Sequence, residues 1–192
     1  RARRRSDEAI ELINNVLKIS KLRLEDSFNK EEVDIASILA RTIKVAKVNA
    51  DAKGVKLTLN NKRKGKHHIE GDPFLIQIAL SNIISNAIKY NNMEGLVEIN
   101  VEEDDENLII KVCDDGIGIP KEDQKKIFTD FFRASNTKQF GAEGSGLGLS
   151  VVKQIVERHN GTIEIQSPSH LSTSKYPGTC VKITLPFLRK EP

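Results

Sequence analysis

Two asparagines four residues apart, Asn82 and Asn86, have the type and spacing to do chemistry in the segment LSNIISNAIKYNN. Asparagine is a mediocre helix former, because its short amide competes for backbone hydrogen bonds. Residues four apart share one helix face, and Lys89 and Tyr90 continue that face by another turn. The face therefore offers amide oxygens, an ammonium group and a phenol ring. Taken alone, the same pattern is also compatible with an ordinary solvated helix face.

A second candidate segment is DDGIGIP, residues 114–120, which follows the apolar run LIIKVC. Gly116 and Gly118 allow the backbone to approach another group closely. The carboxylate of Asp114 stands at the end of an apolar strand and needs a partner, because burying it alone is costly. The exocyclic amine of a purine is one candidate partner, and an Asp-Gly turn without a ligand is the alternative.

A third candidate is the glycine-rich segment GAEGSGLGLSVV, residues 141–152, which runs into an apolar helical pattern. A glycine loop that feeds a helix N-terminus presents N–H groups and a positive dipole end, which suits phosphate. No Gly-Lys-Ser/Thr follows, so it is not a P-loop, and no strand precedes it as in a dinucleotide fingerprint. A flexible linker before a helix is the alternative interpretation.

Apolar periodicity and end signals predict the elements that position these residues. The asparagine segment is expected to be a helix over 73–91, because Asp72 can cap its first turn. Residues 34–52 are expected to form another helix, capped by Asp34 and ended by Gly54. The remaining predicted elements are extended pieces at 55–60 and 67–72, a hairpin over 96–115, helices near 121–132 and over 147–159, and a second hairpin from 162–167 and 178–186.

These elements predict one mixed sheet with helices on one face, an α/β two-layer sandwich. Residues 7–26 precede it and form a helical pattern whose apolar stripe is too broad for a lone surface helix. Such a stripe is typical of a helical bundle, so we expect residues 7–26 to self-associate. The sequence thus predicts a partial bundle segment at 1–28 and a second domain at 29–192.

The bulk composition favours a folded domain. The chain has 192 residues, of which 38% are hydrophobic and 30% charged. Its net charge of +3 comes largely from RARRR and NKRKGKHH, which lack the aromatic residues and reading helix of a nucleic-acid site. No apolar run approaches the ~20 residues of a membrane span, so we expect a cytoplasmic location, whether or not the parent protein is membrane-anchored. Cys113 and Cys180 show neither metal spacing nor a disulfide framework, so we expect small core residues in a reducing compartment.

Four motifs follow one another along the chain: the asparagine helix, D-x-G-x-G, a phenylalanine pair, and G-x-G-x-G before a helix. In this order they resemble the catalytic ATP-binding domain of sensor histidine kinases. This domain belongs to a superfamily shared with DNA gyrase, MutL and a heat-shock chaperone, and has a Bergerat-type ATP-binding fold. Four segments each match a sequence motif of the family: NIISNAIKY, DDGIGIP, FTDFFRA and GSGLGLSVVKQIVERHNG. The resemblance covers about residues 33–188, and residues 7–26 resemble the second helix of the kinase dimerisation and phosphotransfer domain.

The resemblance implies roles around ATP and Mg²⁺. Asn86 would coordinate Mg²⁺ through its side-chain oxygen, with Asn82 beside it, and Lys89 would reach the phosphates. Tyr90 would line the adenine, and Asp114 would accept a hydrogen bond from the adenine amine. The other nucleotide-binding positions that it implies are Gly116, Gly118, Ile119, Phe132, Arg133, Gly144, Ser145, Gly146, Leu147 and Gly148. Residues 131–133 would hinge a lid formed by residues 133–146.

The resemblance also implies an activity. Hydrolysing members of the superfamily have a Glu where this chain has Asn82, and an amide has no basic lone pair at neutral pH. Slow hydrolysis suits transfer of phosphate to a protein nucleophile, so we expect a protein-histidine kinase, with a catalytically idle ATP-binding module as the alternative. None of His67, His68, His159 and His170 precedes an acidic residue, so we expect the acceptor histidine upstream of Arg1. The implied partners are ATP or ADP, a histidine-bearing helix of the parent chain or its dimer mate, and a response regulator receiver domain, but no nucleic acid.

Overall fold

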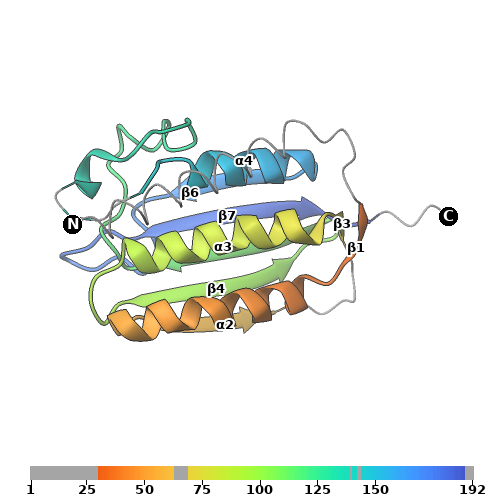
Figure 1. Ribbon diagram of the computed structural model, residues 1–192, viewed down its shortest axis with the longest axis horizontal. Coiled ribbons are helices and arrows are strands. Elements are labelled where there is room, and N and C mark those ends of the chain that lie inside the picture. Colours follow the sequence, from red (N-terminus) through yellow and green to blue (C-terminus); the bar gives the residue numbers. More distant parts are fainter. Residues whose placement is uncertain (1–29, 63–68, 139, 142–143, 189–192) are drawn as a thin grey trace, which may run out of the picture.

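The computed structural model describes residues 30–62, 69–138, 140–141 and 144–188, which form two layers (Figure 1). A five-stranded sheet is one layer, and three α-helices cover one of its faces, as predicted. The sheet order is β2-β4-β5-β7-β6, with β2 parallel to β4 and all other neighbours antiparallel. The elements are β1 (Glu31–Val33), α2 (Ile35–Lys53), β2 (Lys56–Asn61), β3 (Ile69–Gly71), α3 (Pro73–Lys89), β4 (Leu96–Glu103), β5 (Asn107–Asp114), α4 (Gly148–Arg158), β6 (Thr162–Gln166) and β7 (Thr179–Pro186). Strands β1 and β3 pair separately.

The helices begin and end at the predicted signals. Asp34 caps α2 by accepting a hydrogen bond from Ala36 N, and Gly54 ends that helix with a φ of 72°. Asp72 caps α3 by accepting from the N–H groups of Phe74 and Leu75. A side-chain cap of this kind stabilises a helix by about 1 kcal/mol, so local sequence fixes where α2 and α3 start.

The core lies between the helices and one face of the sheet. Residues that alternate along the central strands, such as Ile99 and Val112, are buried in one cluster with Leu80 and Ile84 of α3. Burying each such side chain stabilises the fold by roughly 1.5–3 kcal/mol, so this packing sets the position of α3 on the sheet. The opposite sheet face, which we call the open face, carries the alternate side chains of each strand, those that do not point into the core.

Residues 121–132 form successive turns, so the predicted short helix there is wrong. The backbone closes i→i+3 hydrogen bonds in this stretch, such as Lys126 N to Asp123 O at 2.8 Å. Asp123 also accepts from both the N–H and the hydroxyl of Ser135, which ties the turns to the following loop. Phe131 has a φ of 63°, a value that a right-handed helix does not contain.

The interpretation of the cysteines as unpaired core residues is also wrong, because Cys113 and Cys180 form a disulfide bond. The two residues lie opposite each other on β5 and β7. Their side chains belong to the open face, whereas the neighbours Val112 and Val181 point into the core. The expectation of a reducing compartment rested on unpaired thiols and loses its basis.

Two further expectations concern chain segments and membranes. The predicted helix at 7–26 and the predicted domain boundary after residue 28 lie outside the described residues. Within the part of the chain that the structure describes, every helix is too short or too polar to cross a lipid bilayer.

Candidate functional site

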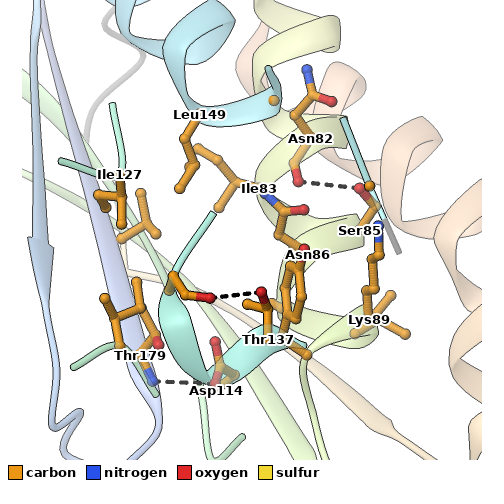
Figure 2. A pocket seen from close by; sticks show the side chains of 18 of the residues that line it. Asn82, Ile83, Ser85, Asn86, Lys89, Asp114, Ile127, Thr137, Leu149 and Thr179 are labelled. Atoms are coloured by element: carbon orange, nitrogen blue, oxygen red, sulfur yellow. Dashed lines mark hydrogen bonds between the residues drawn. The ribbon is translucent and has the colours of Figure 1, made fainter. Parts of the chain in front are cut away.

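A cavity of about 520 Å³ lies beside α3, between that helix, the start of α4 and the segments that follow β5 (Figure 2). Small-molecule pockets usually have volumes of about 300–1,000 Å³, so the cavity is large enough for a nucleotide-sized ligand. Thirteen of the residues predicted to bind nucleotide or metal line it: Asn82, Asn86, Lys89, Tyr90, Asp114, Gly118, Ile119, Phe132, Arg133, Gly144, Ser145, Gly146 and Gly148. The tertiary structure thus brings the three candidate segments together.

Helix α3 supplies one polar wall of the cavity. Its apolar stripe packs on the sheet, which leaves Asn82, Asn86 and Lys89 half-buried along the cavity. A Cβ atom added at Gly148 would lie 3.7 Å from Asn86 Nδ2 and 3.8 Å from Asn82 Oδ1. The first residue of α4 is therefore next to both amides, and the positive end of the α4 dipole is beside them.

Asp114 is the buried acid of the cavity. Its Oδ1 atom accepts hydrogen bonds from Gly116 N at 2.9 Å and Thr179 N at 3.1 Å. Burial raises the pKa of the carboxyl group to about 7, with a smaller rise from the charge of Asp115, although the two hydrogen bonds oppose the shift. Because both bonds end on Oδ1, Oδ2 is the oxygen on which a ligand can place a further donor.

Two glycines of the third segment allow close approach. Gly146 has a φ of 75°, and an added Cβ would lie 2.7–2.8 Å from backbone atoms of Phe131 and Phe132. A Cβ at Gly144 would lie 2.8 Å from Lys89 Nζ. The glycine segment thus lies against both the phenylalanine pair and the basic end of α3.

Two predicted nucleotide-binding residues, Gly116 and Leu147, do not line the cavity. Gly116 acts through Asp114, to which its N–H donates, and a Cβ there would lie 2.4 Å from Tyr90 O. Leu147 is 1% exposed and sits at the N-cap position of α4, so its side chain belongs to the protein interior.

Sequence reasoning missed Lys53 and Thr179, which also line the cavity. Lys53 Nζ donates to Lys89 O at 2.7 Å and Ile88 O at 3.1 Å, at the C-terminus of α3. Burial lowers the pKa of Lys53. The place of Lys53 in the last turn of α2 resembles an ordinary helix-end lysine. Thr179 donates its backbone N–H to Asp114, a contact that no residue type marks, so neither residue gave a sequence signal.

The first residues of the predicted lid are held by specific contacts. Asn136 Nδ2 donates to Gly118 O at 3.0 Å and to Ile117 O at 3.3 Å, and Thr137 is buried. These bonds attach the start of the segment 133–146 to the DDGIGIP turn. Lid motion in this segment stays a prediction.

The two described histidines, His159 and His170, form hydrogen bonds with other groups of the fold. His159 is buried, its Nε2 accepts from Asp72 N at 3.0 Å, and its Nδ1 lies 2.7 Å from Ile155 O. Burial lowers the pKa of His159, which favours a neutral ring with Nδ1 protonated. His170 pairs with Glu98 on the open face. His67 and His68 lie outside the described residues.

The polar groups that line the cavity suit an adenine nucleotide together with a hard cation. Asp114 can accept from an exocyclic amine, and the α4 N-terminus and Lys89 offer positive charge to phosphates. The amide oxygens of Asn82 and Asn86 are of the ligand type that Mg²⁺ takes alongside phosphate and water.

Comparison with known proteins finds similar sequences. Residues 71–189 match the family model described as "Histidine kinase-, DNA gyrase B-, and HSP90-like ATPase". The sensor-like histidine kinase SenX3 of Mycobacterium tuberculosis is 35% identical over 158 residues, 82% of this chain and 38% of that protein. The sensor histidine kinase WalK of Bacillus subtilis is 33% identical over 189 residues, 97% of this chain and 30% of that protein. The chain therefore spans about a third of the length of these relatives.

Solved structures share the fold. The mycobacterial sensor histidine kinase MprB has a TM-score of 0.70 at 24% identity, covering 83% of this chain and 100% of that one. The histidine kinase ThkA, solved in complex with the response regulator protein TrrA, has a TM-score of 0.75 at 21% identity, covering 95% of this chain and 49% of that one.

Proposed function

Because the chain belongs to the family of histidine kinase-, DNA gyrase B- and HSP90-like ATPases, we propose that it contains the ATP-binding catalytic domain of a sensor histidine kinase. The supporting observation is that one cavity is lined both by Asp114, which can accept a hydrogen bond from an adenine amine, and by Lys89 and the glycine segment, which suit phosphate. Figure 2 shows Asp114 and Asn82 at opposite sides of the cavity, with Asn86 between them.

The adenine end of the proposed site is built around Asp114. Its Oδ2 accepts a hydrogen bond from the adenine amine, while Gly116 and Thr179 hold Oδ1 in place. Tyr90 lines the base, together with Ile119 of the same cavity. A charge-assisted hydrogen bond of this kind contributes about 1.5–3 kcal/mol, which is enough to select an amino group over a carbonyl group.

The phosphate end is built from α3 and the glycine segment. Asn86 would hold Mg²⁺ through its amide oxygen, with Asn82 as a second ligand or neighbour, and Lys89 would contact the phosphates. Mg²⁺ held there would neutralise charge that develops on the transferred phosphoryl group. Gly144, Ser145, Gly146 and Gly148 wrap the phosphates with backbone N–H groups, for which their place beside Lys89 and the asparagines is suitable.

The proposed reaction transfers the γ-phosphate to a histidine on a dimerisation helix rather than to water. Asn82 cannot take a proton from water, so hydrolysis is slow. His159 is engaged at both ring nitrogens, which excludes it as an acceptor in this fold. We assign residues 1–28 to a dimerisation and phosphotransfer segment and residues 29–192 to the catalytic domain. The partners are the histidine-bearing helix of the parent chain or its dimer mate, and a response regulator receiver domain.

Calorimetric titration with ATP tests the binding step. Binding should require Mg²⁺, and Asn86→Ala should remove this metal dependence. The matched control is Asn60→Ala, which removes an amide on β2 that bonds only to Asn100 among the described side chains. Metal-independent binding in the unchanged chain would reject Asn86 as the Mg²⁺ ligand.

Labelled ATP tests the transfer step. The chain alone should accumulate no acid-labile, base-stable label from γ-labelled ATP. The histidine-bearing helix of the parent protein, supplied in the same chain or in a mixed dimer, should restore transfer, because positioning is the main requirement of phosphoryl transfer. ATP binding without any transfer in the restored protein would favour a catalytically idle module.

A further inference from the structure

A row of side chains with metal-ligand chemistry crosses the open face of the sheet, away from the nucleotide cavity. Glu98 of β4 pairs in register with Cys113 of β5, and Cys113 pairs in register with Cys180 of β7. The three side chains therefore lie side by side on one face. Their neighbours Asp114 and Thr179 point to the other face and line the cavity.

The loop between β6 and β7 brings a fourth group to this row. His170 belongs to that loop, and its ligand atom and the two sulfur atoms all lie within 4.8 Å of one another. His170 Nε2 is 3.0 Å from Glu98 Oε2. A metal-binding histidine usually donates its second ring N–H to a carboxylate, and Glu98 is placed to accept that bond.

The loop that carries His170 is anchored rather than loosely attached. Ser169 Oγ donates to Asp114 O at 2.7 Å, and Ser169 N donates to Pro177 O at 2.9 Å. Ser169 is buried, whereas the side chain of His170 is 55% exposed. The backbone thus holds the imidazole near the sulfur atoms while its ring remains able to turn.

We propose that Cys113, Cys180 and His170 form a Zn²⁺ site in the reduced protein, with Glu98 orienting the imidazole, and that the disulfide closes this site. Reduction by a dithiol breaks the single S–S bond with two electrons and two protons, and the dithiol becomes a disulfide. Zinc binding then displaces one proton from each thiol. Oxidation by a small-molecule disulfide, which takes up two electrons and two protons to become two thiols, forms the S–S bond again and releases the metal, because a protein disulfide has no thiolate to offer.

The ligand set and distances suit zinc. Zn²⁺ takes thiolate and imidazole ligands at about 2.3 Å and 2.0–2.1 Å in a tetrahedral arrangement, which places ligand atoms roughly 3.5–3.8 Å apart. The His170 ligand atom lies within 4.8 Å of both sulfur atoms and needs to approach them by about 1 Å, which rotation of its ring can supply. Breaking the S–S bond lets the two sulfur atoms, which that bond holds closer together than the tetrahedral spacing, rotate apart. Three protein ligands leave a fourth position for water or another ligand.

Cobalt titration tests the site in the full chain, with His67→Ala and His68→Ala introduced so that those imidazoles do not compete. The protein is reduced, freed of reductant without air, and titrated with Co²⁺, whose absorption reports tetrahedral thiolate ligation. One equivalent should produce the thiolate bands, Zn²⁺ should displace it, and the disulfide form should show no bands.

Variants separate this site from binding by two thiols alone. His170→Ala should weaken Co²⁺ binding at least tenfold, and Glu98→Gln should weaken it by about 10–100-fold. The matched control is Gln166→Ala, which changes the cross-strand neighbour of Cys180 and should leave affinity unchanged. Absence of thiolate bands in the reduced protein, or equal affinity in His170→Ala, would overturn the proposal.

Discussion

Folding favours the neutral form of the Asp114 carboxyl group, whereas a bound hydrogen-bond donor favours its ionised form. Burial raises its pKa from 3.8 to about 7, so the unfolded chain releases this proton more readily than the folded one. The contribution of Asp114 to the free energy of unfolding therefore falls as pH rises from about 4 to 7 and stays low above that. A ligand that donates to the ionised carboxylate compensates for this cost.

Asp114→Asn should consequently stabilise the nucleotide-free protein at high pH. The amide oxygen can still accept from Gly116 and Thr179, and it carries no charge to bury. The gain relative to the unchanged chain should grow by about 2–3 kcal/mol between pH 5 and pH 8, as measured by urea unfolding at each pH. A gain independent of pH would show that Asp114 is not buried with a raised pKa.

The same substitution should change nucleotide preference. With Oδ1 held by two backbone N–H groups, the amide nitrogen of Asn would take the place of Oδ2 and oppose the adenine amine. Affinity for ATP should fall by about 10–150-fold, the equivalent of 1.5–3 kcal/mol, while affinity for GTP should fall less, because guanine has a carbonyl there. Competition titration measures both.

The matched control for this preference is Asp115→Asn. Asp115 does not line the cavity, and its Oδ1 accepts from Leu96 N, a bond that an amide retains. An equal loss in both variants, or an unchanged ATP to GTP ratio in Asp114→Asn, would remove Asp114 from base recognition.

At the scale of elements, the glycine segment is positioned by contact with the turn at Phe131 and Phe132. Gly146 and Gly141 both have positive φ values, 75° and 70°. A Cβ at Gly146 would meet backbone atoms of the phenylalanine pair at 2.7–2.8 Å, whereas a Cβ at Gly141 would meet nothing within 4 Å. The two positions share the same type of backbone conformation but differ in the space around them.

We therefore expect Gly146→Ala to be more harmful than Gly141→Ala. Backbone strain should cost about 1–3 kcal/mol at either position, and steric conflict should add at least about 1 kcal/mol at Gly146. Thermal unfolding measures the stability difference, and titration should show weaker ATP binding for Gly146→Ala. Equal effects on both would mean that the segment does not rest on the phenylalanine turn.

At the scale of the whole molecule, the broad apolar stripe at residues 7–26 predicts association between chains. Sedimentation should show a dimer that becomes a monomer when Ile13 and Leu17 are changed to Asp, because two buried charges without partners are costly. Val45→Asp is the control, since Val45 is an exposed apolar residue on α2. A monomer at every workable concentration of the unchanged chain would contradict the prediction.

The sequence by itself determined the local structure and the chemical types of the candidate site. Asp34 and Asp72 cap their helices with their own side chains, and period-two alternation separates the two faces of β4 and β5. These signals act over a few residues, so they can be recognised without knowing the fold. The order of the motifs also indicated which residues belong to one site, because the resemblance covered several sequence motifs at once.

Only the tertiary structure decided which distant groups meet. Cys113 and Cys180 are 67 residues apart, and their pairing depends on the register of β5 with β7. The turns at 121–132, where the sequence predicted a helix, are tied to the following loop by hydrogen bonds from Ser135 to Asp123, a contact with no short-range pattern. Lys53 reaches the cavity through the packing of α2 on α3, and the pKa of Asp114 follows from burial. Register, long-range hydrogen bonds and desolvation depend on the whole fold, so no short segment of sequence contains them.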